Sequence, residues 1–160
     1  MTLAIVELDA TGTHALRRSV LRNGDPAASV VFDEDAWPGT IHLGVTDGHE
    51  LVGTSSWIPR PLPAEFAEEQ ADHHPADVPA QHWQLRGMAT ANGRRGDGIG
   101  GLLVEAGCAR CAAQGARLVW AKARDAALVF YGRHGFAVVG DGFVDATTQL
   151  PHHVVVRRLD

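Results

Sequence analysis

The chain lacks a long hydrophobic segment and an excess of positive charge. None of its apolar runs approaches the roughly 20 residues that a membrane-spanning helix needs, so we expect no membrane as a partner. The start, MTLAIVELDA, has neither a basic flank nor a small-residue cleavage site, so we expect no signal peptide and a cytoplasmic protein. A net charge of −5 argues against nucleic acid as the main partner, because binding its phosphates requires a basic face. Composition leaves a homodimer possible.

Cysteine is also scarce, with only Cys108 and Cys111, spaced C-x-x-C. A redox pair or half of a zinc site has this spacing, but no second pair exists and both residues fall inside an expected helix. We therefore expect both thiols to pack in the core and no metal to be bound. The aspartates and histidines within residues 72–77 resemble a metal site in composition only, and we expect them to be solvated in a proline-rich stretch.

The remaining sequence alternates between apolar and amphipathic stretches, which predicts an α/β (mixed α+β) fold around one sheet. With 160 residues, 45% of them hydrophobic, the chain can bury one core, and we expect one domain over residues 1–160. Leu16, Val20 and Leu21 should face inward from the first helix. We expect a short buried strand at 3–8, further strands at 81–91, 116–123, 135–145 and 152–159, and a hairpin over 40–59 with its turn at Asp47-Gly48. We expect helices over 13–22, 99–115 and 125–135, an irregular segment up to residue 39, and a surface excursion with one short helical turn over 60–80.

Glycine is concentrated in one place, the stretch ATANGRRGDGIGG at residues 89–101. Glycine costs conformational entropy on folding. A concentration of glycines before a helix therefore indicates a need for accessible backbone N–H groups or for close approach of the backbone to a ligand. The N-terminus of a helix binds phosphate in this way. The segment GDGIGG satisfies G-x-G-x-x-G, but the next strand has no acidic residue at its end before Asp125, which makes a dinucleotide fold a poor match. A nucleotide P-loop is excluded because no lysine followed by serine or threonine is present.

A second pattern fits this loop better. Residues 95–100, RGDGIG, match Q/R-x-x-G-x-G/A, and the segment LRGMATANGRRGDGIGGLLV resembles the strand, coenzyme A pyrophosphate loop and helix of the GNAT superfamily of amine N-acetyltransferases. About 30 residues later, AALVFYGRHGF resembles the A-x-x-F-Y-x-x-x-G-F helix and strand of the same family. The resemblance covers a coenzyme A-binding core of about residues 81–137. It implies a mostly antiparallel sheet, splayed between its fourth and fifth strands and flanked by helices.

The resemblance also implies acetyl-CoA as co-substrate and an amine-bearing acceptor as partner. Backbone groups on the preceding strand would line the acetyl-pantetheine arm, and the loop would hold the pyrophosphate, with Arg95 adding charge. We expect the Asp97 side chain to point to solvent. The implied cofactor-binding residues are Met88, Ala89, Thr90, Arg95, Gly96, Asp97, Gly98, Ile99, Gly100 and Gly101.

Tyr131, the only tyrosine, occupies the F-Y position of the family, which implies a general acid for the departing thiolate. The alternative is a packing role on the helix face. Arg124 stands where the family often has asparagine, and it could cap the helix, form a local salt bridge or reach the cofactor. Asp125 is the expected N-cap of the helix.

The sequence leaves the general base open among four histidines, His42, His82, His152 and His153, and a water chain. Two functions remain from different classes. The first is an N-acetyltransferase acting by direct attack of the primary amine of a small acceptor on acetyl-CoA. The second is a catalytically silent module that binds or senses acyl-CoA. The acceptor pocket is expected to come from segments 20–40 and 60–80.

Overall fold

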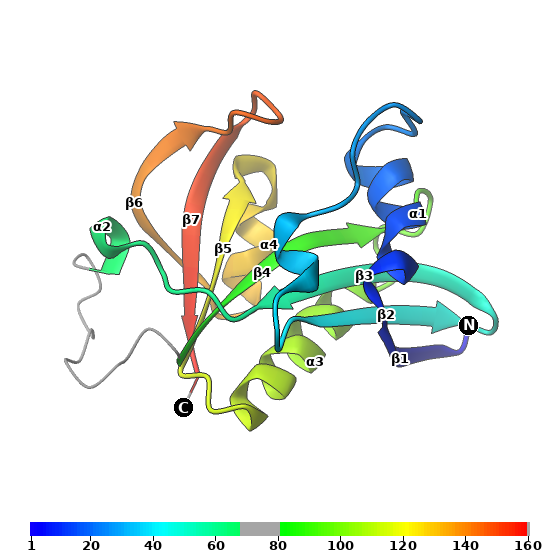
Figure 1. Cartoon of the computed structure of the whole chain (residues 1–160), viewed down its shortest axis with the longest axis horizontal. Coiled ribbons are helices and arrows are strands. Elements are labelled where there is room, and N and C mark those ends of the chain that lie inside the picture. The colour runs from blue at the N-terminus through cyan, green and yellow to red at the C-terminus, as the bar shows by residue number, and fades with distance from the viewer. Residues whose placement is uncertain (68–80, 160) are drawn as a thin grey trace. The chain divides into compact units, whose positions relative to one another are not determined.

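The computed structural model describes residues 1–67 and 81–159, and their strands and long helices follow the order expected from the sequence (Figure 1). The expected hairpin over 40–59 is formed by the second and third strands. The strands are β1 (Leu3–Leu8), β2 (Ile41–Asp47), β3 (Glu50–Ile58), β4 (His82–Thr90), β5 (Leu118–Arg124), β6 (Ala137–Val144) and β7 (Pro151–Arg158), and the α-helices are α1 (His14–Leu16), α2 (Ala64–Ala67), α3 (Ile99–Ala113) and α4 (Leu128–Arg133).

The strands form one seven-stranded sheet in the order β1-β2-β3-β4-β5-β7-β6. Antiparallel pairs join β1 to β2, β2 to β3, β5 to β7 and β6 to β7, whereas β4 and β5 are parallel. The parallel ladder joins only residues 82–84 to residues 118–120. The expected mixed, mostly antiparallel sheet is confirmed. The splay between the fourth and fifth strands and the single domain over 1–160 stay predictions.

The internal contacts divide the chain into two compact units, each described by itself below. The first unit consists of Met1–Ile58 and Leu85–Arg110, and the second of Pro59–Gln84 and Cys111–Asp160. Both β4 and α3 contribute residues to each unit, so the division cuts across two regular elements.

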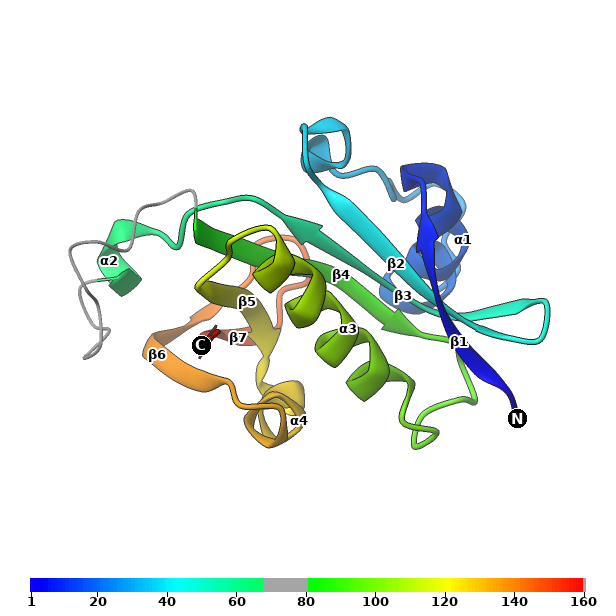
Figure 2. The same cartoon turned by 90° about the horizontal axis from the view of Figure 1, so that it is seen from below.

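In the first unit, helical segments lie on both faces of the sheet (Figure 2). Successive residues of β3 point to opposite faces of the sheet, because side chains alternate along a strand. Ser56 accepts a hydrogen bond from Arg17, in the π-helical turn that follows α1, whereas Trp57 packs against α3 at Gly107. A Cβ at Gly107 would lie 1.8 Å from Cζ2 of Trp57, so only glycine lets α3 approach β3 this closely.

The second unit is built on β7, which pairs with β5 on one side and β6 on the other. One face of these strands carries the main hydrophobic cluster, and the Trp120 indole N–H donates to the Arg60 carbonyl at 2.9 Å, which ties the segment before α2 to this face. The cluster consists of Leu62, Leu118, Trp120, Val139, Val154 and Val156, with Phe66 and Phe143 packed against it.

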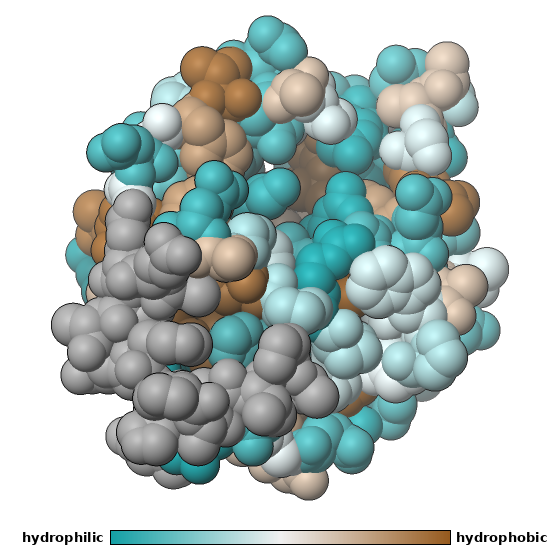
Figure 3. Space-filling view, turned by 60° about the vertical axis from the view of Figure 1, so that its left-hand side comes forward, coloured by the Kyte–Doolittle hydropathy of each residue, from teal (hydrophilic) through white to brown (hydrophobic). Residues whose placement is uncertain are grey.

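The surface of the second unit carries few large hydrophobic side chains. On the face that Figure 3 shows, the described surface is mostly hydrophilic and hydrophobic residues lie in separate groups. Among the described residues of this unit, four large ones are exposed, Val129, Val138, Val144 and Leu150. Scattered exposures of this kind are normal for a folded protein and indicate no docking surface.

Two expectations about the N-terminal segment are wrong. β1 is exposed along much of its length rather than buried, since it forms an edge of the sheet. The helix expected over 13–22 is split into a 3-10 turn (Ala10–Thr13), α1 and a π-helical turn (Arg17–Leu21). It buries Leu16 as expected, but it also buries Arg17.

Candidate functional site

The loop between β4 and α3 has the backbone conformation that glycine permits. Gly93, Gly96 and Gly98 have φ angles of +81°, +91° and +80°, which L side chains rarely adopt. A Cβ at any of the three would meet no heavy atom within 4 Å, so the space beside the loop is open. Within the described chain, the N–H groups of Gly96 and Gly98 have no hydrogen-bond acceptor. The first N–H groups of α3 also lack acceptors within the helix, so backbone donors are concentrated here.

The two arginines of this loop differ in their partners. Arg94 donates to the carboxylates of Asp97 and Asp47, both at 2.8 Å. Arg95 is exposed and makes no hydrogen bond or ion pair within residues 1–67 and 81–159. The Asp97 side chain is 35% exposed and its carboxylate pairs with Arg94, so it reaches solvent in part. Arg94 therefore fixes the loop, and Arg95 keeps its charge available for an anion.

The three residues expected to line the acetyl arm lie at the end of β4, in the first unit. Just before them Gly87 has a φ of +65°, and a Cβ there would lie 2.8 Å from Cε2 of Phe32. The regular strand conformation is therefore interrupted immediately ahead of these residues. Ala89 is buried, whereas Met88 and Thr90 are half-buried.

Tyr131 lies on α4 in the second unit and is buried. Its ring makes edge-to-face contacts with Phe130 and Phe136, each with ring centres 5.3 Å apart. Burial raises the pKa of Tyr131 to about 12. Its hydroxyl makes no hydrogen bond to any residue in the described chain, so an O–H donor is held in a fixed place without a protein partner.

The turn before α4 differs from the expected cap. Asp125 begins a 3-10 turn, and its carboxylate lies 2.6 Å from Nδ1 of His153 instead of capping the helix. Arg124 occupies the N-cap position without a side-chain hydrogen bond, and it is exposed without an ion pair among the described residues. A Cβ at Gly142 would lie 2.9 Å from Nε2 of His153, so β6 leaves room for this imidazole only because residue 142 is glycine.

The other three candidate histidines, His42, His82 and His152, are buried. Their Nδ1 atoms lie 2.7, 3.1 and 2.9 Å from a serine hydroxyl, a backbone N–H and a backbone carbonyl, respectively. Burial lowers the pKa of His42, so this ring stays neutral in the fold. Only His153 among the four combines partial exposure with a carboxylate partner.

Sequence reasoning missed a buried ion pair in the first unit. Arg17 is 1% exposed and donates to the Asp35 carboxylate at 2.8 and 2.9 Å and to the Ser56 hydroxyl at 2.9 Å. Burial acts to raise the pKa of Asp35, but hydrogen bonds from Arg17 and from the N–H of Phe32 outweigh it, so the pKa is lowered. The only sign of this ion pair in the sequence is the acidic run DED at residues 33–35, and no local pattern links that run to Arg17.

The acidic run belongs to a short 3-10 helix, Asp33–Ala36, rather than an irregular segment. Glu34 is buried and pairs with Arg86 of β4 at 2.7 Å. The guanidinium carbons of Arg17 and Arg86 lie 3.8 and 3.9 Å from the centre of the Phe32 ring. An ion pair and a cation–π contact with Arg86 attach this segment to β4, and one of each with Arg17 attaches it to the π-helical turn after α1.

Both cysteines are buried in α3, which confirms the packing expected for them. Over residues 1–67 and 81–159, no three histidine, cysteine or acidic side chains are grouped so that they could hold a metal ion. The group within residues 72–77 lies outside the described residues.

The sequence profile of the acetyltransferase (GNAT) family matches residues 12–136, a range that contains the glycine loop, Arg95 and Tyr131. The chain belongs to the GNAT family. The uncharacterized N-acetyltransferase YitI of Bacillus subtilis (strain 168) is 26% identical over 141 residues, 88% of this chain and 87% of that protein.

Solved structures show the same GNAT fold. An acyl-CoA N-acyltransferase from Pseudomonas aeruginosa has a TM-score of 0.72 at 18% identity, covering 98% of this chain and 99% of that one. An aminoglycoside 6'-N-acetyltransferase complexed with coenzyme A has a TM-score of 0.68 at 18% identity, covering 97% and 96%. At these identities the likeness establishes the fold alone.

GNAT membership confirms the resemblance that the two motifs indicated, and it supports an acyltransferase activity. The roles of individual residues stay predictions. No helix in the described part of the chain is long and apolar enough to cross a membrane. A cytoplasmic location and a homodimer stay predictions.

Proposed function

We propose that this GNAT protein transfers the acetyl group of acetyl-CoA to a primary amine of a small acceptor. The observation that carries the proposal is the open glycine loop at the N-terminus of α3, with unpaired Arg95 beside it. Backbone donors and the helix dipole at such a terminus favour a phosphate group. The family structure determined with coenzyme A supports this ligand.

The chemistry of the loop fits a pyrophosphate. Gly96 and Gly98 offer N–H groups with no side chain in the way, and Arg95 adds a charge-assisted hydrogen bond. The carboxylate of Asp97 would repel the ligand, but Arg94 neutralises it. Arg94 is shared between Asp97 and Asp47, so the positive charge that the loop offers to a ligand is that of Arg95, beside the backbone N–H groups.

Acetyl-CoA supplies an activated acyl group, whose C–S bond breaks as the C–N bond to the acceptor forms. The chain must donate a hydrogen bond to the thioester oxygen, supply a proton to the departing sulfur and accept one from the amine. We assign the first task to a backbone N–H among residues 88–90, following the resemblance. The second belongs to Tyr131.

The environment of Tyr131 fits a hydrogen-bond donor better than a strong acid. A phenol with a pKa of about 12 stays protonated throughout the physiological range. An ordinary thiol has a pKa near 8.5, so complete transfer of the phenol proton to a thiolate is uphill. The hydroxyl therefore acts mainly by hydrogen bonding to sulfur as its negative charge develops.

For the base we propose His153, oriented by Asp125. The carboxylate at 2.6 Å accepts a hydrogen bond from Nδ1, which leaves Nε2 as the proton acceptor. His153 lies on the opposite face of β7 from Val154, so the amine nitrogen gives its proton to Nε2 by way of water. The sulfur gains a proton from the medium by way of Tyr131, and the products are an amide and free coenzyme A. The three buried histidines use Nδ1 within the fold.

Two measurements test the proposal. Calorimetry with acetyl-CoA should show micromolar binding and a raised melting temperature, with NADH as the control that gives neither. A panel of primary amines should then release free coenzyme A thiol. Binding without thiol release from any amine would favour the silent acyl-CoA-binding module, and tight NADH binding would restore the dinucleotide alternative.

A further inference from the structure

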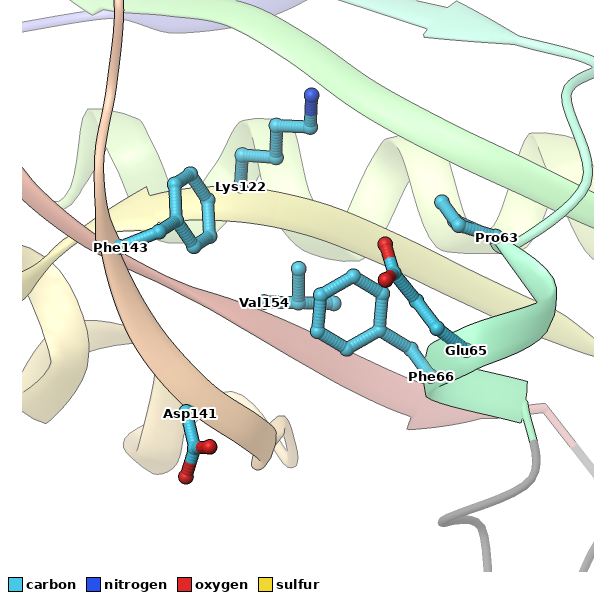
Figure 4. A pocket seen from close by; sticks show the side chains of 7 residues that line it. All are labelled: Pro63, Glu65, Phe66, Lys122, Asp141, Phe143 and Val154. Atoms are coloured by element: carbon cyan, nitrogen blue, oxygen red, sulfur yellow. The ribbon is translucent and has the colours of Figure 1, made fainter.

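The second unit contains a cavity of about 400 Å³ beside its hydrophobic cluster, a size typical of small-molecule sites (Figure 4). Residues from α2 and its N-terminal flank, β5, β6 and β7 surround it, so segments distant in sequence meet there. The lining residues are Pro63, Glu65, Phe66, Lys122, Asp141, Phe143 and Val154.

The floor and walls of the cavity are apolar. Val154 is fully buried, and the rings of Phe66 and Phe143 pack against the same cluster while staying half-buried. In Figure 4 both rings lie around the space above Val154. Two aromatic side chains on an apolar floor provide a surface for an aromatic or branched hydrocarbon group.

Charges of opposite sign stand at the rim. Lys122, the only lysine of the chain, and Glu65 both line the cavity and are exposed. Neither makes a hydrogen bond or ion pair with another residue in the described chain, so one ammonium and one carboxylate remain unmatched. The carboxylate of Asp141 points away from the rings in Figure 4.

We propose that this cavity binds the acceptor as a zwitterionic primary amine, of the kind represented by an aromatic α-amino acid. The apolar group lies between Phe66 and Phe143, the ligand carboxylate pairs with Lys122, and the ligand ammonium pairs with Glu65. This assignment rests on the proposed acetyltransferase function, because it names the acceptor class. The pattern of one positive and one negative group over an apolar floor selects for both charges of the ligand.

Calorimetric titration of the full chain with three ligands of equal ring size tests the assignment. Phenylalanine should bind, whereas phenethylamine and 3-phenylpropionate, each lacking one charge, should each bind about two- to fivefold more weakly, the contribution of one exposed ion pair. Lys122→Met should weaken the binding of phenylalanine by the same factor and leave the binding of phenethylamine unchanged. Glu65→Gln should weaken the binding of phenylalanine by the same factor and leave the binding of 3-phenylpropionate unchanged. Asp141→Asn is the matched control and should change none of the three.

The sole lysine also reports where the ligand binds. Reductive ¹³C-methylation keeps the charge and labels Lys122 together with the N-terminus, which serves as an internal reference. Phenylalanine should shift the Lys122 signal and not the reference. Phe66→Ala should abolish this shift, whereas Val144→Ala, at an exposed position outside the cavity, should preserve it.

Specific results would overturn the assignment. Equal affinity for all three ligands, unchanged phenylalanine binding in Lys122→Met, or no Lys122 shift would each remove the zwitterion site. Thiol release measured separately with acetyl-CoA distinguishes the two proposals. If another amine is acetylated while phenylalanine does not bind, only the acceptor class is wrong. If phenylalanine binds as described but acetyl-CoA does not bind, the acetyltransferase function and the acceptor role fail, and only ligand binding stands.

Discussion

Replacing Arg95 by alanine should weaken coenzyme A binding without weakening the fold. A hydrogen bond to a charged group contributes about 1.5–3 kcal/mol when shielded from water. Arg95 is exposed, so screening reduces this to about 1 kcal/mol, or about fivefold in Kd. Since Arg95 makes no hydrogen bond or ion pair within the described chain, the free energy of unfolding should change by no more than about 0.5 kcal/mol.

Calorimetry with two ligands makes this prediction specific. Coenzyme A carries the pyrophosphate, whereas pantetheine has the same thiol arm without it. Arg95→Ala should raise Kd for coenzyme A about fivefold and leave pantetheine unchanged, and the difference should shrink at high salt because the charge is exposed. Unchanged coenzyme A affinity, or an equal loss for pantetheine, would refute the assignment of Arg95 to the pyrophosphate.

Arg94→Ala is the matched variant, and it should behave differently. It removes the ion pairs to Asp47 and Asp97, so the melting temperature should fall. It also leaves the Asp97 carboxylate unpaired in the loop, so coenzyme A should bind more weakly. Adding Asp97→Asn should recover part of that affinity. An Arg94 variant with unchanged stability would contradict the division of tasks between the two arginines.

Three further outcomes are expected. Tyr131→Phe should lower kcat at least tenfold and leave Kd for acetyl-CoA unchanged, since such a donor contributes about 100- to 10,000-fold and a thiolate is a fair leaving group without help. Full activity in a steady-state assay would exclude the hydroxyl from the reaction. Gly107→Ala should lower the free energy of unfolding in urea by about 2 kcal/mol through its clash with Trp57, and an unchanged value would mean that α3 does not pack this closely. The pKa of His42 is lowered in the fold. The stability that its neutral ring contributes is therefore fully present above the unfolded-state pKa near 6.5, and it is lost as pH falls through the folded-state pKa. His42→Gln should therefore flatten the pH dependence of the unfolding midpoint below about pH 6.5, and an unaltered pH dependence would count against a neutral buried ring.

The order of strands and helices was predictable because each depends on a local pattern. Alternation of apolar residues and the Asp47-Gly48 turn predicted the hairpin of β2 and β3, and Gly48 has the positive φ that such a turn requires. The glycine loop was predictable for the same reason, since Gly96 and Gly98 are needed for their φ angles. Local chemistry alone specifies these features.

The features that were missed depend on partners distant in sequence. Arg17 was placed on no particular face, yet it is buried because Asp35, 18 residues later, satisfies its charge. Asp125 was expected to cap α4, because an aspartate before a helix is a good N-cap. A histidine 28 residues later in the chain takes its carboxylate instead. In both cases a tertiary ion pair outweighs the local preference of the side chain.

The cavity of the second unit combines both situations. Segments 20–40 and 60–80 were expected to build an acceptor pocket. Glu65 and Phe66 of the cavity come from 60–80 and none of its lining residues comes from 20–40, whereas Lys122 and Phe143 come from strands that the sequence predicted only as parts of the sheet. Alternation places Lys122 on the same face as Trp120, next to the main cluster, because residues two apart on a strand share a face. Trp120 is covered by the segment before α2, to which its indole is bonded, whereas Lys122 is exposed at the cavity rim. The periodic pattern assigns a side chain to a face, but only the packing of other segments decides whether that position is core or binding surface.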